Sequence, residues 1–383
     1  MKRRALWYGA LGAVILPLVI GAGWIASLPS PPAAAPAPEV TQAETDATLA
    51  ALKPPKRKRP LVAVIGLNDA TETTDYLMPY GILRRADVAD VVALATGPGP
   101  VTLYPALKVE PDATIASFDA QHPQGADYVI VPAMSRDDDP AALQWIRDQA
   151  AKGAVIVAVC AGAKVAGAAG LLDGKRATTH WYYRDRLLGA SPSIRYVADR
   201  RFVVDQGVAT STGISASMPM SLTLVEAIAG RDKAAAVARS LGLGQWDARH
   251  ASAVFKVTRR FALTVMGNRL AFWNREQFGI GLSPGVDEVS LALVADAWSR
   301  TYRSRAVTFA GVAGPLQARS GIRILPDQVA TPWPAGQRLL EIGSRPPAQA
   351  LNDALAGIAR RYGTRTAEVV AMQLELPWQG VSP

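Results

Sequence analysis

The sequence predicts an α/β fold of three layers (α/β/α), in which helices cover both faces of a parallel sheet. Helical stretches at 74–85 and 140–152 alternate with short apolar runs, and Asp139 is placed to cap the second helix. Continuous apolar runs of this length are typical of strands buried on both faces. These runs lie at 61–65, 91–95, 127–132 and 154–159. Strands that alternate with helices indicate a parallel sheet, because parallel neighbours need a crossover connection.

The composition indicates a globular protein that is not built to bind nucleic acid. Hydrophobic residues make up 49% and charged residues 19% of the 383 residues, so a sizeable core can form, and the length allows two domains. The net charge of +9 is partly concentrated in clusters at 2–4 and 56–59, which leaves the rest of the chain only mildly basic. We therefore expect no nucleic-acid partner.

The cysteine and histidine content argues against disulfides and metal sites. The single cysteine, Cys160, excludes an intramolecular disulfide, and the three histidines are too scattered to suggest a structural zinc site. We expect neither a metal nor a cofactor. His122 and His250 lie in polar contexts that are typical of surface residues.

The N-terminal segment predicts a membrane anchor. Residues 5–28 carry no charge, match the length of a helix that crosses a bilayer, and follow a basic cluster. This pattern predicts a single-pass membrane protein whose folded part lies on the extracytoplasmic (periplasmic) side. A cleaved signal peptide, with a small-residue site near 33–35, is the alternative. Residues 29–60 are rich in Pro and Ala and are expected to form a semi-extended linker.

Two matches within the chain indicate an internal repeat. The stretch 92–114 matches 307–329 without gaps, and the stretch 222–243 matches 355–376. Similarity between Ala-rich helices could explain the second match alone. Both matches occur in the same order, however, and this favours a duplication.

The second copy is shorter than the first. The two matched segments lie about 80 residues closer together in the second copy, and the missing part is the one that holds Cys160 and His180. We therefore expect a first domain at 61–246 and a degenerate, partial copy of it, without an active site, at 250–383.

The segment around Cys160 has the pattern of a nucleophile elbow. An apolar strand at 154–159 leads into Cys160 and then into the small residues 161–163, and a helix-like stretch follows. Small neighbours permit a sharp strand-to-helix turn that exposes the central side chain at the edge of the sheet. Backbone N–H groups at the start of the helix would lower the pKa of the thiol and stabilise an oxyanion. An inert, buried cysteine that packs as a small hydrophobe is the alternative.

Five blocks, taken in order, resemble the ThiJ/PfpI superfamily over residues 61–243. They are a first loop and helix at 71–79, a turn at 108–112, the elbow at 157–162, an A-T-T-H segment at 177–180 and a late strand and loop at 209–213. The resemblance implies the flavodoxin-like fold of the class I glutamine amidotransferases. Since members of this superfamily commonly dimerise, it also implies an intrachain pseudo-dimer between the two copies, or a homodimer.

The resemblance implies roles for individual residues. Cys160 matches the reactive thiol, and Asp75 matches a carboxyl group that hydrogen-bonds the thiol, although a helix N-cap would also explain Asp75. His180 matches a histidine near the cysteine, which would act as a general base or only pack there. The backbone N–H groups that would form an oxyanion hole are those of Ala161, Ala133 and Met134.

Two departures from the family pattern limit the chemistry. Ala161 replaces the histidine that follows the cysteine in protease-like members, which argues against a peptidase. Ala133 and Met134 follow Pro132 where many members have Gly-Gly, and their Cβ atoms restrict the loop. This second departure puts acyl-transfer catalysis in doubt.

Two classes of function remain open. The run 171–181 resembles isonitrile hydratases and the sensor domains of AraC-type regulators, and no AraC-type DNA-binding domain follows it. The first expectation is a membrane-anchored, cysteine-dependent hydratase, hydrolase or deglycase that acts on a small electrophile. The alternative is a non-enzymatic sensor that uses the cysteine as a ligand or as an oxidation sensor. Both functions imply a small molecule as the partner.

Overall fold

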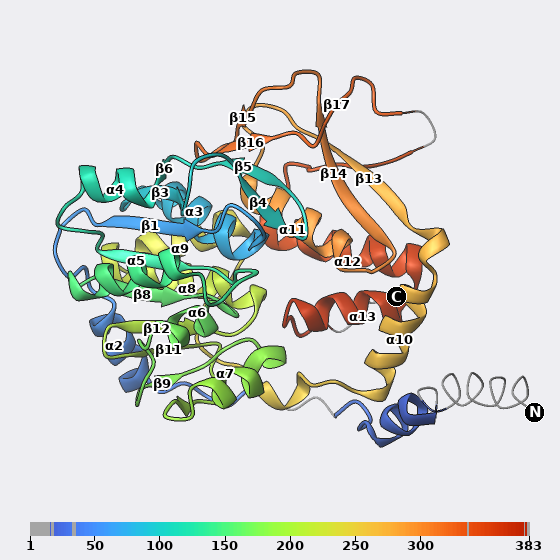
Figure 1. The fold of residues 1–383 in the computed structure, drawn as a ribbon, viewed down its shortest axis with the longest axis horizontal. Coiled ribbons are helices and arrows are strands. Elements are labelled where there is room, and N and C mark those ends of the chain that lie inside the picture. Colours follow the sequence, from blue (N-terminus) through green and yellow to red (C-terminus); the bar gives the residue numbers. More distant parts are fainter. Residues whose placement is uncertain (1–15, 17–18, 33–35, 335–336, 379, 381–383) are drawn as a thin grey trace, which may run out of the picture.

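A mostly parallel sheet of seven strands forms the centre of the first half of the chain (Figure 1). The computed structural model describes residues 16, 19–32, 36–334, 337–378 and 380. In spatial order the strands are β11 (Phe202–Asp205), β12 (Val208–Ser211), β8 (Val155–Ala158), β7 (Tyr128–Val131), β1 (Leu61–Gly66), β3 (Asp90–Ala95) and β6 (Ala113–Thr114). Strand β11 is antiparallel to β12, and the other neighbours are parallel. The sheet confirms the flavodoxin-like α/β fold that the sequence predicts.

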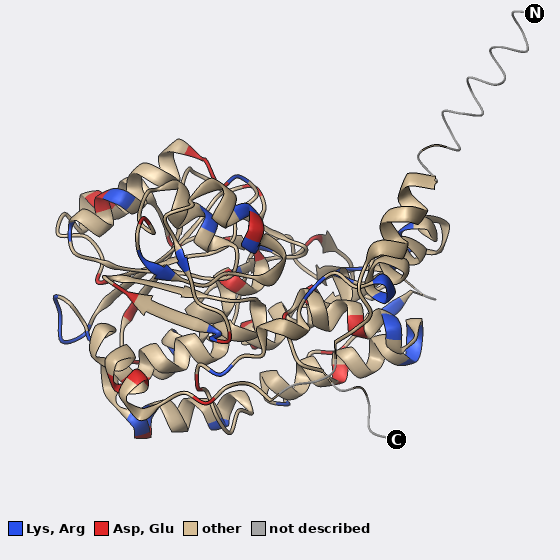
Figure 2. Ribbon diagram, turned by 90° about the horizontal axis from the view of Figure 1, so that it is seen from below, with Lys and Arg blue, Asp and Glu red and all other residues tan. Residues whose placement is uncertain are grey.

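Helices cover both faces of this sheet, because alternate side chains of each buried strand point to opposite sides. Val62 and Val64 belong to one core, and Ala63 and Ile65 belong to the other. The first core includes α3 (Thr73–Ala86), α8 (Ser217–Ala229) and α9 (Arg231–Leu241). The second includes α4 (Ile115–Gln121), α5 (Pro140–Ala151), α6 (Gly162–Ala168) and α7 (Arg184–Ala190). In Figure 2 the central strands are largely free of charged residues, as buried strands should be.

The C-terminal half adds a smaller α/β unit. Its four parallel strands lie in the order β17 (Gln328–Val329), β14 (Ser304–Ala310), β13 (Glu276–Gly281) and β18 (Arg338–Leu340). Its helices are α10 (Arg259–Leu270), α11 (Glu288–Ser299), α12 (Pro347–Tyr362) and α13 (Thr364–Gln373). Leu291 of α11 and Leu355 of α12 belong to the same apolar core as α3 and α8. The two halves therefore share one core.

A third sheet joins the two halves of the chain. Its order is β15 (Leu316–Gln317), β16 (Arg323–Leu325), β5 (Lys108–Glu110), β4 (Val101–Tyr104) and β2 (Thr71–Glu72). Strands β5 and β16 pair antiparallel, with Val109 opposite Ile324. Helices α3 and α11 also pack closely, since a Cβ atom on Gly81 would lie 2.5 Å from Oε1 of Glu288. Both a strand pair and a helix pair therefore fix the C-terminal half to the first domain.

Part of the segment 29–60 differs from the linker that the sequence predicts. It contains α2 (Gln42–Ala51), and the following residue, Leu52, is completely buried. The hydroxyl group of Tyr128 donates a hydrogen bond to the Leu52 carbonyl oxygen at 2.7 Å. Arg57, in the basic cluster, forms an ion pair with a buried carboxylate. The end of this segment is therefore part of the fold, which the composition alone did not indicate.

The N-terminal segment does not support the predicted anchor. Within 5–28 the structure describes a short helix at 19–27. No helix among the described residues has both the length and the apolar character that a membrane span requires. This finding contradicts the predicted single-pass localisation. Residues 1–15 and 17–18 of the expected span lie outside the described residues.

Asp127 anchors the basic cluster to the sheet, and its removal should destabilise the fold. Its carboxylate is completely buried and accepts hydrogen bonds from the backbone N–H groups of Lys56, Arg57 and Leu61 and from the Arg57 side chain. We expect Asp127→Ala to lower the free energy of unfolding by about 3 kcal/mol, because these donors lose their acceptor. Chemical denaturation measures the change. The control Asp46→Ala, at an exposed position, should change it by less than about 0.5 kcal/mol, and equal effects would contradict the prediction.

Candidate functional site

Cys160 lies in a strained turn between β8 and α6. Its φ angle is 57°, in the left-handed region that side-chain-bearing residues rarely adopt. The residue after next must be a glycine, because a Cβ atom on Gly162 would lie 2.0 Å from the carbonyl oxygen of Val131 in β7. The turn has the geometry of a nucleophile elbow, in which the strand ends abruptly and the helix begins against the neighbouring strand.

Two segments that are distant in sequence hold this turn in place. The backbone N–H of Cys160 donates to Oγ of Ser211 at 3.3 Å, at the end of β12. The hydroxyl group of Thr179 donates to the Cys160 carbonyl oxygen at 3.0 Å. The elbow, the A-T-T-H segment and the late strand therefore meet at one edge of the sheet, as the resemblance implies.

Asp75 lies in the first turn of α3 and is completely buried. Its Oδ2 atom accepts a hydrogen bond from the backbone N–H of Ala133 at 3.1 Å. No described group lies within hydrogen-bond distance of its Oδ1 atom. The N-cap of α3 is Glu72, whose carboxylate accepts from the Asp75 backbone N–H at 2.6 Å. The alternative role of Asp75 as the N-cap therefore does not apply.

Burial dominates the protonation of the site. It raises the pKa of Cys160 well above its ordinary value, and the charges of Asp75 and Glu72 raise this pKa further. Burial also raises the pKa of Asp75 well above its usual range, and the charge of Glu72 adds to the rise. The expected low pKa of Cys160 is therefore reversed, and burial favours the uncharged forms of both the thiol and the Asp75 carboxyl group.

A residue from the C-terminal half that the sequence did not single out also reaches this cluster. Nη2 of Arg300 lies 2.7 Å from Oε1 of Glu72, and Nε of Arg300 lies 2.7 Å from Oδ2 of Asp296. Burial raises the pKa of Glu72 to about 7, the charge of Asp296 adds to the rise, and Arg300 opposes it. No local motif marks Arg300, since it follows the end of a helix that is buried almost along its whole length.

His180 is buried beside the elbow, but both of its ring nitrogens are engaged. Nδ1 accepts a hydrogen bond from the backbone N–H of Tyr182 at 3.1 Å. This contact assigns the ring proton to Nε2, which donates to the carbonyl oxygen of Gln373 at 3.0 Å. Burial lowers the pKa of His180, so the ring stays neutral at neutral pH. The geometry favours the packing role over the general base.

The end of α13 closes over this part of the site. Oε2 of Glu375 accepts the backbone N–H of Gly213 at 2.6 Å, and Oε1 lies 2.9 Å from Nε2 of His250. His250 is only 4% exposed, so its predicted surface position is wrong. The charge of Glu375 adds to the pKa rise of Cys160. Only the tertiary contacts identify Glu375 as part of the site.

The expected oxyanion hole is only partly present. The backbone N–H of Ala161 donates to the thiol of Cys160. The N–H of Ala133 is already used by Asp75, and its carbonyl oxygen accepts from the backbone N–H of Glu72 at 2.9 Å. Met134 forms a β-bridge with Thr71. An acyl-transfer oxyanion would therefore have to displace an existing hydrogen bond.

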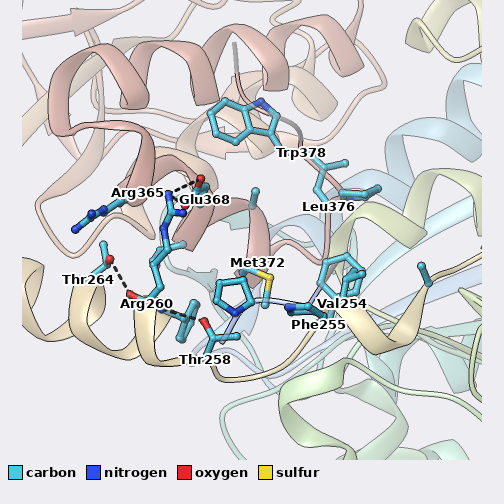
Figure 3. A pocket seen from close by; sticks show the side chains of 17 residues that line it. Val254, Phe255, Thr258, Arg260, Thr264, Arg365, Glu368, Met372, Leu376 and Trp378 are labelled. Atoms are coloured by element: carbon cyan, nitrogen blue, oxygen red, sulfur yellow. Dashed lines mark hydrogen bonds and ion pairs between the residues drawn. The ribbon is translucent and has the colours of Figure 1, made fainter. Parts of the chain in front are cut away.

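Among the described residues, neither a metal site nor a large apolar cavity is found at the cysteine. In the part of the chain that the structure describes, no group of three His, Cys, Asp or Glu side chains could hold a metal ion. A largely apolar cavity of about 370 Å³ lies between α10, α13 and the segment after α13. Figure 3 shows Val254, Phe255 and Met372 around it, with Arg260 paired to Glu368 at one side. Its lining does not include Cys160.

Comparisons with known proteins identify the family that the first domain resembles. The model of the DJ-1/PfpI family matches residues 61–227. An isonitrile hydratase of Pseudomonas putida is 38% identical over 42% of this chain and 68% of its own length. A Parkinson disease protein 7 homologue of Danio rerio is 31% identical over 46% of this chain and 93% of its own length. An HTH-type transcriptional regulator of Pseudomonas aeruginosa is 28% identical over 54% of this chain and 59% of its own length.

The pKa directions make a prediction about thiol reactivity. The rate of Cys160 alkylation by iodoacetamide should rise with pH, with a midpoint above the ~8.5 of a free thiol, because burial and two carboxyl groups disfavour the thiolate. Asp75→Asn should move the midpoint to lower pH, because it removes a carboxyl group whose negative charge, once it ionises, raises the pKa of the thiol. Since the chain has one cysteine, total alkylation measured by mass spectrometry reports Cys160 alone. A midpoint that rises in Asp75→Asn would instead show that Asp75 stabilises the thiolate as a hydrogen-bond donor.

Proposed function

Because the chain belongs to the DJ-1/PfpI family, we propose that it uses Cys160 as a nucleophile towards a small electrophile, and that this reaction is the hydration of an isonitrile. The observation that carries the proposal is a thiol in a nucleophile elbow together with a buried carboxyl group, Asp75, whose charge acts on the thiol and whose Oδ1 has no partner among the described residues. This carboxyl group is a proton donor beside a nucleophile, which is what addition to a neutral carbon requires.

The reaction can be written with these two groups alone. Asp75 gives its proton to the terminal carbon of the isonitrile, the sulfur of Cys160 bonds to the same carbon, and an electron pair of the carbon–nitrogen bond moves to nitrogen. The thiol proton passes to Asp75, which restores its neutral form. Water then adds to the carbon of the resulting thioimidate, its protons go to nitrogen and to the departing sulfur, and an N-substituted formamide leaves. The sequence needs no external oxidant or reductant.

The electrostatics of the site support a neutral substrate. Burial raises the pKa of both Asp75 and Cys160, which favours an uncharged carboxylic acid and an uncharged thiol in the resting site. An uncharged electrophile enters such a site without the desolvation cost that a charged one would bear. Cys160 is only 6% exposed, which favours a small molecule.

The loop after β7 also favours addition over acyl transfer. In an acyl transfer the negative charge develops on oxygen and needs preorganised N–H donors. Ala133 already donates its N–H to Asp75. In the isonitrile reaction the electron pair of the first adduct resides on nitrogen, so that donor is not required. The resemblance to an isonitrile hydratase points to the same chemistry.

A sensor that does not turn over its ligand is the second candidate. The observation in its favour is that the end of α13 covers the site through Gln373 and Glu375, while burial keeps the thiol protonated. One of the relatives is a transcriptional regulator. A sensor would bind a small molecule, or undergo oxidation of Cys160, without releasing a product.

Turnover distinguishes the two candidates. The purified protein should convert a small alkyl isonitrile into the corresponding formamide, as measured by mass spectrometry, and Cys160→Ala should abolish the conversion. Asp75→Asn should reduce the rate by about 10²–10⁴-fold, because it removes the proton donor. If the protein binds the isonitrile and forms no formamide, the sensor function is favoured. Circular dichroism and thermal unfolding of each variant check that the fold is intact.

The contacts of His180 predict a smaller effect for its replacement. His180→Gln should retain more than about one tenth of the turnover rate, because both ring nitrogens serve structural hydrogen bonds and neither is available as a base. The variant should, however, unfold at a lower temperature than wild type, since it weakens the contact with Gln373. A loss of about 10²-fold or more in an intact fold would restore the general-base role.

A further inference from the structure

Five elements of the C-terminal unit follow their counterparts in the first domain at a nearly constant spacing. Strands β1 and β13 begin at Leu61 and Glu276, which are 215 positions apart. The same spacing relates the starts of α3 and α11, of β5 and β16, and of β6 and β17, and β14 begins within one residue of the position expected from β3. The sheet order β17-β14-β13-β18 likewise parallels the order β6-β3-β1-β7. The two units therefore have one topology over this stretch.

Side-chain contacts repeat with the same spacing. Oδ2 of Asp112 accepts the backbone N–H of Ala93 at 2.8 Å, and Oδ2 of Asp327 accepts the backbone N–H of Thr308 at 2.8 Å. Each carboxylate holds the turn before the edge strand of its sheet, β6 or β17, against the strand next to it. Chance similarity between helices does not explain why the same hydrogen bond occurs at equivalent positions of both units.

The two units meet as two subunits of a symmetric dimer would. Strands β5 and β16 occupy equivalent positions, and they pair antiparallel with Val109 opposite Ile324, its own equivalent. Lys108 pairs with Leu325, which is the equivalent of Glu110. Glu110 pairs with Arg323, which is the equivalent of Lys108. The pairing is therefore unchanged when the two strands are exchanged. This self-complementary pattern is the signature of a two-fold axis.

Two buried ion pairs lie on either side of this axis. Arg300 pairs with Glu72 at 2.7 Å, and Arg85 pairs with Asp287 at 2.6 Å. Arg300 lies 215 positions after Arg85, and Asp287 lies 215 positions after Glu72, so the two pairs are made by equivalent residues. The end of α3 therefore contacts the start of α11 in the way that the end of α11 contacts the start of α3.

The two units differ in the residues that surround the cysteine site and its equivalent position. Asp296 holds Nε of Arg300, whereas Gly81 stands at the equivalent position beside Arg85, whose Nε and Nη1 have no described partner. Ser290 stands at the position equivalent to Asp75. The four described strands of the second sheet include no counterpart of β8, and the chain has one cysteine. One of the two equivalent sites therefore has its nucleophile, its acid and a doubly held arginine, and the other has none of these.

We infer that residues 276–329 occupy the place of a second subunit, and that Arg300 acts from this place as a positioning residue that keeps Glu72 a carboxylate beside Asp75 and Cys160. The inference rests on the proposed function, because it takes the Cys160 site as the reactive one. According to this inference, the C-terminal half of the same chain provides a required part of the Cys160 site. A single copy of the chain then contains one complete site.

The equivalent arginines provide a matched pair of variants in the full-length chain. The ionisable groups that face Glu72 are Asp75, Cys160, Asp296 and Arg300. The pH profile of Cys160 alkylation should contain a break near the pKa of Glu72, about 7, because Glu72 acts on the thiol through its charge. In Arg300→Met this break should move up by about one pH unit, because Glu72 loses its cation. In Arg85→Met it should stay in place, although that variant also loses a buried ion pair.

Further variants keep the test decisive. Glu72→Gln retains an oxygen to cap α3 and should lack the break, and adding Arg300→Met to it should change nothing more. Arg300→Lys keeps the charge and should resemble wild type, so a shift as large as that of Arg300→Met would overturn the inference. Identical profiles for Arg300→Met and Arg85→Met would also overturn it, even if isonitrile turnover is found. The expected shift without any turnover would instead refute the reaction and retain the inference.

Discussion

The carboxyl group of Glu72 connects the parts of the structure on which the Cys160 site depends. Its Oε2 atom accepts the backbone N–H of Asp75 and so begins α3, while its Oε1 atom pairs with Arg300 from the C-terminal half. The first contact determines where the Asp75 carboxyl group lies, and the second holds α11 against α3. Because one buried carboxyl group makes both contacts, the chemistry of the first domain and the docking of the second unit are coupled.

Burial gives this site a chemistry unlike that of an exposed thiolate. A thiol at the start of a helix is expected to ionise easily, but the start of α6 acts here on a group surrounded by apolar side chains and two carboxyl groups. The cost of removing charge from water exceeds the gain from one backbone N–H. In the proposed reaction a proton transfer accompanies bond formation, and the Oδ1 atom of Asp75, which has no partner among the described residues, is available for it.

The proposed pseudo-dimer within one chain would allow its two halves to diverge. In a homodimer every substitution appears on both sides of the two-fold axis, whereas here Asp296 can stand opposite Gly81 and Asp75 opposite Ser290. The second unit can lack the strand that would hold a nucleophile and still share one apolar core with α3 and α8 of the first domain. What it retains is the interface, together with the arginine that reaches the remaining site.

The sequence by itself determined the fold class, the elbow and the blocks that meet there, because apolar runs, small residues around Cys160 and local capping signals act over a few neighbouring positions. The contacts of His180 with Gln373 and of Glu72 with Arg300 were decided only by the tertiary structure, since each joins residues about 200 positions apart. The same holds for the direction of the Cys160 pKa: the elbow pattern suggested a lower value, and burial among carboxyl groups raises it. Desolvation and charge depend on everything that surrounds a group in space, and a local motif contains only its neighbours in the chain.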